Sequence, residues 1–202
     1  MTTSATHGRT GGGRQAEIDD AAKKIAFASG LSAITLRRLS ATVGVEPGVI
    51  AQHEPSITAL VARIFYELAT DECEEIAREI ATEASPVAAL RRLVEGLIHD
   101  SHDNFNSIWA DAWSLGRRSA PLAKAARDSM QQWNALVLEL VARGVAAGDF
   151  VEIDPDLVAM QFFALIDSTT AYSLVGYRTA DDRARLVRRT LEISLGLAEG
   201  TL

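Results

Sequence analysis

The chain has a single cysteine, Cys73, which excludes an internal disulfide and suits a reducing cytoplasm. Its helical spacing with Ile76, Ala77 and Ile80 predicts a buried, inert thiol rather than a redox sensor. No apolar run approaches the roughly 18–20 residues that a membrane-spanning helix needs. Residues 1–13 contain no apolar core, so we expect no secretory signal and predict a cytoplasmic protein.

Motifs of common enzyme classes are also missing. The sequence has no Walker loop, nucleophile elbow or zinc-protease motif. None of its four histidines follows a glutamate by three residues, as helical di-metal proteins require. We therefore expect neither catalysis nor a cofactor. His99, Asp100, His102 and Asp103 admit a metal site, but histidines also interact favourably with a helix end, and we favour a solvated helix end without metal.

Acidic residues outnumber basic ones, and the net charge of −7 by itself argues against a nucleic-acid partner. The charge is unevenly distributed, however. Residues 1–53 carry six Lys or Arg against four acids, whereas the other 149 residues carry 14 against 23. A mildly basic N-terminal part on an acidic body fits a protein that binds DNA at one end only.

The periodicity of the sequence is helical almost throughout. Residues 1–13 are rich in Gly, Ser and Thr without periodicity and predict a disordered arm. Beyond them apolar residues recur at helical spacing, most clearly over 57–80, and no strand pattern is present. We predict an all-α chain with about nine helices. Their expected ranges are 18 to about 30, 32–43, a short helix from 47, 55–82, a helix from 86, 105–112, 121–147, 155–177 and 180–198.

Several short motifs lie at a regular spacing. They are Ile18-Asp19-Asp20-Ala21-Ala22, Phe27 with Gly30, Thr35 to Val43, Gly44-Val45, Pro47-Gly48 and Pro55-Ser56. With them, residues 16–68 resemble the DNA-binding head of the tetracycline-repressor (TetR) family. Residues 147–150, 154–155 and 164–167 look like the junction and dimer helix of the family's ligand-binding domains. The Trp-Ala-Asp-Ala-Trp segment at 109–113 is similar to the subgroup of choline-responsive regulators.

The resemblance implies a helix-turn-helix head over residues 14–54 and a helical ligand-binding and dimerisation domain over 55–202. In such a head the second helix lies in the major groove, while flanking amides and polar side chains contact phosphates. Gln52 and His53 would face the bases, and Gly48 would let the DNA backbone approach closely. The predicted DNA-binding residues are Thr35, Arg37, Arg38, Pro47, Gly48, Gln52 and His53.

The sequence departs from the family at three positions of this head. Ala51 and Glu54 stand where the family usually has aromatic residues, and Ile57 stands where it has a lysine. The first aromatic and the lysine hold phosphates in the family, and Glu54 adds a negative charge near the groove. We therefore expect weak, strongly salt-dependent DNA binding, helped by Arg9 and Arg14 on the arm. The alternative is a TetR-like sensor or interaction protein with weakened or lost DNA binding.

Aromatic residues of the middle helices are the candidates for a ligand pocket. Trp109 and Trp113 are four residues apart and share a helix face. With Asp111 or Asp167 nearby they would suit a cationic or amphipathic ligand through cation–π contact, although the same residues also fit an ordinary core. The predicted ligand-binding residues are Phe105, Trp109, Trp113, Met130, Trp133, Phe163 and Asp167.

The last two predicted helices supply the apolar surface of a homodimer. The residues expected there are Leu157, Phe162, Ile166, Leu174, Leu186, Leu191 and Leu195. Two helices from each subunit would make a four-helix interface, and its two-fold symmetry would require a near-palindromic operator. The sequence thus predicts a homodimeric repressor. An unidentified small molecule would release it from double-stranded operator DNA by tilting the 55–82 helix.

Overall fold

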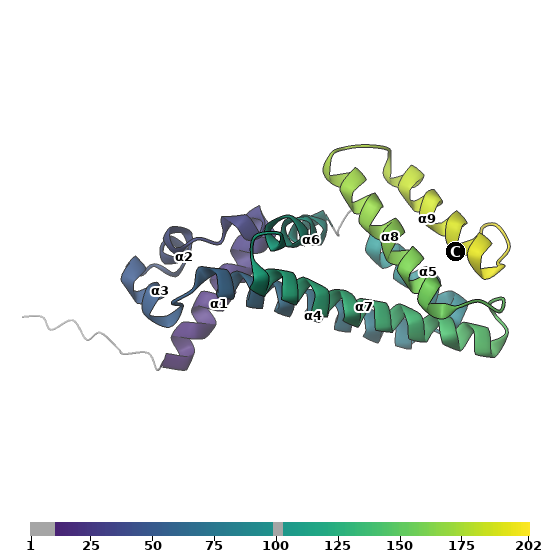
Figure 1. Ribbon diagram of the computed structural model, residues 1–202, viewed down its shortest axis with the longest axis horizontal. Coiled ribbons are helices and arrows are strands. Elements are labelled where there is room, and N and C mark those ends of the chain that lie inside the picture. The colour runs from purple at the N-terminus through teal and green to yellow at the C-terminus, as the bar shows by residue number, and fades with distance from the viewer. Residues whose placement is uncertain (1–10, 99–102) are drawn as a thin grey trace, which may run out of the picture.

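The computed structural model describes residues 11–98 and 103–202, and within these ranges the chain is all-α, as predicted (Figure 1). Nine α-helices and one short 3-10 helix follow one another without a strand in the described residues. They are α1 (Gly11–Ser29), the 3-10 helix η1 (Leu31–Ala33), α2 (Leu36–Val43), α3 (Pro47–His53), α4 (Ile57–Ala81), α5 (Pro86–Ile98), α6 (Asp103–Gly116), α7 (Ala120–Ala147), α8 (Pro155–Leu174) and α9 (Ala180–Leu195).

Helix starts and ends follow the chemistry of their caps. Thr35 has an extended backbone, and its hydroxyl accepts a hydrogen bond from the Arg38 amide at 3.2 Å, so α2 begins at Leu36. Gly44, with φ +75°, ends α2 in the left-handed conformation that a residue with a side chain rarely adopts. Asp154 caps α8 in the same way as Thr35 caps α2, through the Asp156 amide.

Several helix boundaries differ from the sequence prediction. Residues 11–13, assigned to a disordered arm, form the first turn of α1, while residues 1–10 lie outside the described part of the chain. The helix predicted from Ser32 is two elements, because η1 and an extended linker precede α2. The helix α8 ends at Leu174 rather than Tyr177, and α9 ends at Leu195, where Gly196 adopts φ +70°.

Two long helices connect the ends of the molecule. Figure 1 shows α4 and α7 side by side along most of its length, and they form the largest packing contact. The helices α1, α2 and α3 lie at one end with α6 against them, and α5, α8 and α9 lie at the other. Any shift of α4 or α7 therefore changes the packing at both ends of the molecule.

The buried side chains form two clusters that share these helices. The first joins α1 to α3 with the first half of α4, α6 and the start of α7, and it includes Leu39, Phe65 and Ile108. The second joins the rest of α4 and α7 with α5, α8 and α9. Trp109 packs against both clusters. The head predicted over 14–54 thus shares its core with the body.

The helix α8 alone, within the described residues, is long and apolar enough to cross a membrane by length and composition. The sequence analysis did not anticipate such a segment. It packs Val158, Ala159 and Phe162 into the second cluster and carries Asp167 in its second half, as the core helix of a globular fold does. The helix α8 therefore buries one face in the second cluster and leaves other apolar side chains exposed.

The predicted dimer residues fall into two groups that differ in exposure. Phe162, Ile166, Leu191 and Leu195 are buried in the chain's own second cluster, whereas Leu157, Leu174 and Leu186 are exposed. A side chain already enclosed within its own subunit adds little area to an interface. The exposed set is extended on the same helices by Met160 and Ile193, which are 61% and 66% exposed.

Candidate functional site

The N-terminal end of α2 presents exposed polar groups at one end of the molecule. Thr35, Arg37 and Arg38 are all exposed. The Thr35 hydroxyl is engaged as the helix cap, and the Arg38 guanidinium donates to the hydroxyl of Ser29 at 2.7 Å. Arg37 therefore extends from the first turn of a helix whose backbone amides favour an anion.

The helix α3 has one buried face and one open face. Ile50 is fully buried and anchors the helix, while Pro47, Gly48 and Gln52 are exposed and His53 is half-buried in the last turn. A β-carbon placed on Gly48 would meet no atom within 4 Å. The fold itself does not require glycine at this exposed position, so the backbone of α3 is open to a partner there.

Glu54 does not add free charge near the groove, and this corrects the sequence prediction. Its side chain is only 11% exposed and forms an ion pair with Arg63 of α4 and a hydrogen bond with Gln15 of α1. Arg63 also contacts the carboxylate of Asp19 at 2.9 Å. The largest influence on the pKa of Arg63 is desolvation, which lowers it, but the Asp19 hydrogen bond and neighbouring carboxylates raise it overall.

The remaining residues expected to influence DNA contact are distributed over α1, α3 and α4. Ala51 is exposed on α3, and Ile57 is half-buried and packs against the first cluster at the start of α4. Arg14 belongs to α1, where it pairs with Glu17 three residues on, so it is not part of a free arm. Arg9 lies outside the described residues.

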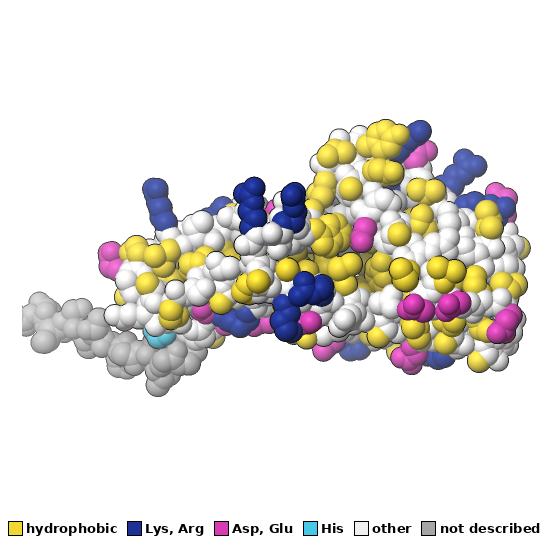
Figure 2. Space-filling view, viewed as in Figure 1, with side chains coloured by type: hydrophobic (Ala, Val, Ile, Leu, Met, Phe, Trp, Pro, Cys, Tyr) yellow, Lys and Arg dark blue, Asp and Glu magenta, His cyan; other side chains and the backbone are white. Residues whose placement is uncertain are grey.

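A cavity of about 720 Å³ lies between α6, α7 and α8, with single lining residues from α4 and α5. Figure 2 shows hydrophobic side chains gathered in the hollow where α6 meets α8. Its lining residues are Glu72, Leu97, Asn106, Trp109, Trp113, Met130, Gln131, Trp133, Asn134, Ala135, Leu138, Asp156, Met160, Phe163, Ala164, Ile166, Asp167 and Thr170. The size falls within the 300–1,000 Å³ typical of small-molecule sites.

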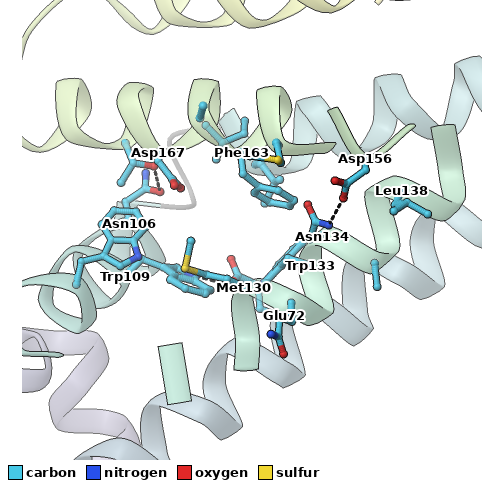
Figure 3. A pocket seen from close by; sticks show the side chains of 18 residues that line it. Glu72, Asn106, Trp109, Met130, Trp133, Asn134, Leu138, Asp156, Phe163 and Asp167 are labelled. Carbon is cyan, nitrogen blue, oxygen red and sulfur yellow. Dashed lines mark hydrogen bonds between the residues drawn. The ribbon is translucent and has the colours of Figure 1, made fainter. Parts of the chain in front are cut away.

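The two ends of the cavity differ in chemistry (Figure 3). Asp167 lies at one end beside Asn106, whose side-chain oxygen accepts a hydrogen bond from Thr170 at 3.1 Å. Asp156 and Asn134 lie at the other end, 3.4 Å apart, near Leu138. Desolvation by burial raises the pKa of Asp167 to about 6.

Aromatic rings form much of the wall. The rings of Trp109 and Trp113 have centroids 5.9 Å apart, and Trp109 also packs edge-on against Phe65 of the first cluster at 5.0 Å. The Trp109 indole N–H donates to the carboxylate of Glu72 at 3.2 Å, which fixes the ring. The buried indole N–H of Trp133 has no hydrogen-bond partner among the described residues.

The structure brings together six of the seven residues predicted for ligand binding, from three helices. They are Trp109, Trp113, Met130, Trp133, Phe163 and Asp167. Phe105 is the exception, because it packs edge-on against Phe27 of α1 at 5.2 Å, inside the first cluster. Asp111 is also outside the pocket. The sequence analysis missed Asp156 and Met160, although both lie at helical spacing from Phe163 and Asp167.

The helix α6 connects this cavity with the head formed by α1, α2 and α3. One of its faces lines the cavity, and another carries Phe105 and Asp111 against the head. The Asp111 carboxylate accepts a hydrogen bond from the Ser32 amide at 3.1 Å. Gly30, with φ +81°, permits this approach, since a β-carbon there would lie 2.5 Å from an Asp111 oxygen.

The metal alternative of the sequence analysis rests on residues that are not described. Among residues 11–98 and 103–202 no group of three or more His, Cys, Asp or Glu side chains could hold a metal ion. His99, Asp100 and His102 lie outside these ranges. The backbone of Asp103 is described, but its side chain is not.

A helix-turn-helix head that shares its core with a cavity-bearing helical body defines a helical DNA-binding regulator fold. Residues 86–195 match the family model of the BetI-type transcriptional repressor C-terminal domain. The chain therefore belongs to the TetR family of transcriptional regulators, with a C-terminal part of the BetI type. Comparison with the curated proteins finds no match.

Solved structures share the fold at low sequence identity. A transcriptional regulator from Saccharomonospora viridis, solved in complex with choline, superposes with a TM-score of 0.80 at 20% identity, covering 90% of this chain and 96% of that one. A TetR-family regulator from Rhodococcus sp. gives 0.75 at 16% identity, with 90% and 98% covered. FadR from Bacillus subtilis, in complex with stearoyl-CoA, gives 0.66 at 18% identity, with 91% and 99% covered.

Proposed function

We propose that this protein is a cytoplasmic, homodimeric, non-enzymatic repressor that a small molecule releases from a near-palindromic operator. The observation that carries the proposal is the position of α6. Its Trp109 and Trp113 line the cavity, and its Asp111 bonds the head at Ser32. Occupation of the cavity and placement of the head therefore depend on one rigid element.

The exposed residues of α2 and α3 support DNA binding. Gln52 can pair with adenine in a major groove, and Arg37 and the capped start of α2 suit a phosphate. The ion pair of Glu54 with Arg63 removes one of the three features that oppose DNA binding. Ala51 and Ile57 still lack the aromatic and lysine contacts of the family, so we expect binding to be weak and salt-dependent.

The proposed dimer uses the exposed apolar side chains of α8 and α9. These are Leu157, Met160, Leu174, Leu186 and Ile193. All five lie on the two helices that the family resemblance assigns to dimerisation. The double variant Leu186→Asp with Ile193→Asp should sediment as a monomer, and an unchanged dimer would remove this surface from the proposal.

The proposed mechanism is a coupling free energy between the cavity and the spacing of the two heads. A ligand between α6 and α8 shifts α6, and the Asp111 and Phe105 contacts carry the shift to the head while α4 tilts with it. The two recognition helices then lose the half-site spacing. A ligand that fits both arrangements equally would leave DNA affinity unchanged. The choline complex of the Saccharomonospora viridis regulator supports a small organic molecule as the effector.

The test is selection of random duplex DNA on the purified protein at moderate salt, followed by sequencing. We expect enrichment of a near-palindromic motif, and its loss in the double variant Arg37→Ala with Gln52→Ala. A protein that enriches no sequence even at low salt, yet still dimerises and binds ligands, would instead be the TetR-like sensor without DNA binding, which Ala51 and Ile57 favour.

A further inference from the structure

The chemistry of the cavity deepens the proposed function, on which this inference rests. The geometry points to an amphipathic organic monocation as the ligand. Its ammonium group lies between the Trp109 and Trp113 rings and the Asp167 carboxylate, and its apolar chain runs past Phe163 toward Leu138. The ligand is larger than a compact cation and has one charged end.

The charge of the wall selects the sign of the ligand. Three lining residues are acids, namely Glu72 of α4 with Asp156 and Asp167 of α8. The lining residues of α5, α6 and α7 are uncharged, and no Lys, Arg or His is among the lining residues of the described chain. An anionic ligand would meet only like charge in a partly desolvated cavity, whereas a cation is attracted.

The aromatic rings specify the kind of cation. The Trp109 and Trp113 rings are tilted by 40° with centroids 5.9 Å apart, and both line the cavity as an aromatic pair. Aromatic faces bind alkylated ammonium groups through cation–π contact, most strongly for tryptophan. The bond from Trp109 to Glu72, which is 5% exposed, holds one ring in position.

The cavity is longer than an ammonium group alone would fill. Asp156 and Asp167 are eleven residues apart on one face of α8, which is about 16 Å along the helix axis. Figure 3 shows them at opposite ends of the cavity with Phe163 between them. Met160, Phe163 and Leu138 form an apolar wall over this distance. A compact cation at the tryptophan end would leave that wall exposed to water.

Titration calorimetry on the full-length protein tests the ligand class with five probes. They are choline, hexyltrimethylammonium and decyltrimethylammonium as cations, decanoate as the anion, and decan-1-ol as the neutral chain. We expect decyltrimethylammonium to bind most tightly. Each buried methylene should add roughly three- to fourfold in affinity, so the gain from hexyl to decyl should be on the order of 100-fold. Decanoate binding as tightly as the decyl cation would overturn the inference, as would affinities that do not rise with chain length.

Two variants and one control separate the head-group site from general hydrophobic binding. Asp167→Asn should weaken decyltrimethylammonium on the order of tenfold and leave decan-1-ol unchanged. Leu138→Gln should weaken the decyl cation several-fold and leave choline unchanged. Asp71→Asn is the control, since Asp71 precedes Glu72 on α4 but is 68% exposed and pairs with Lys23. An unchanged affinity of Asp167→Asn for the decyl cation would refute the placement of the ammonium group.

The inference and the proposed function can fail separately. A protein that binds the decyl cation but selects no DNA would uphold the ligand class and refute the repressor. A protein that selects DNA and binds decanoate in preference to the cations would refute the ligand class and leave the repressor intact.

Discussion

Arg63, two turns into α4, binds the carboxylate of Glu54, the residue that ends helix α3. The same guanidinium contacts Asp19 of α1 at 2.9 Å and Glu67 of its own helix at 3.6 Å. One side chain thus joins two helices of the head, α1 and α3, to the long helix of the body. A tilt of α4 must carry the end of α3 with it.

Replacing this arginine should destabilise the protein. Arg63→Met leaves the carboxylates of Glu54 and Asp19, which are 11% and 22% exposed, without their cation. We expect the free energy of unfolding in urea to fall by about 1–3 kcal/mol. Arg92→Met is the matched control, because Arg92 pairs with Glu79 at the surface, and it should change stability by less than about 1 kcal/mol. Equal losses in both variants would contradict the proposed importance of the head network.

The contact of Asp111 with the Gly30 turn should appear as energetic coupling. Gly30→Ala places a β-carbon 2.5 Å from an Asp111 oxygen, so it should cost more than the strain of a positive φ alone. Gly44→Ala supplies that reference, since Gly44 has φ +75° and open space around it, and it should cost about 1–2 kcal/mol.

A double-mutant cycle isolates the clash. Asp111→Ala should recover the additional loss of Gly30→Ala and recover nothing of Gly44→Ala, measured by urea unfolding. The same Asp111→Ala protein should retain ligand binding but respond less to ligand in operator affinity, because α6 has lost its bond to Ser32. Additive losses for Gly30 and Asp111 would show that the two residues do not interact.

Asp167 should make stability depend on pH. Its pKa is raised from 3.8 to about 6, chiefly by desolvation, so the folded state holds the proton more tightly than the unfolded chain does. Stability therefore falls as pH rises from about 4 through 6. Asp167→Asn should gain on the order of 1–2 kcal/mol at pH 8 and nothing at pH 4, in urea titrations. A gain of the same size at both pH values would argue against ionisation as its cause.

Two substitutions in the head should have different effects on DNA binding. Arg37→Ala removes the proposed phosphate contact from each subunit of the proposed dimer, so affinity should fall for all sequences and the salt slope should decrease by about 2. Gln52→Ala should relax base preference at one position of each half-site with little change in slope. Arg185→Ala, on α9 at the opposite end of the molecule, should behave as the wild type in both measurements.

The helices were predictable because their signals are local. Proline at the first turn of α3, α5 and α8, together with glycine after α2 and α7, marks helix boundaries through backbone geometry alone. The separate turn η1 was missed because residues 32–43 were assigned to a single helix. The extended backbone of Thr35 ends that assignment at α2, and the positive φ of Gly30 lies where Asp111 of α6 packs against the turn.

The orientation of helix faces was less predictable. The helix α8 is apolar on most of its surface, so its sequence does not tell whether Phe162 or Leu157 faces the core, and the structure buries the first and exposes the second. Phe105 and Trp109 are likewise four residues apart, yet one packs against Phe27 and the other lines the cavity. Asp111 turns to Ser32, which lies 79 residues away in sequence. Such choices depend on contacts between distant segments, which a single sequence does not specify.

The chain contains three tryptophans, and all three line the same cavity. None of its intrinsic tryptophan emission comes from elsewhere in the molecule. Ultraviolet excitation of the unmodified protein therefore reports on the occupant of that cavity without a dye. A library of candidate effectors can be screened by the change in emission, before any operator sequence is known.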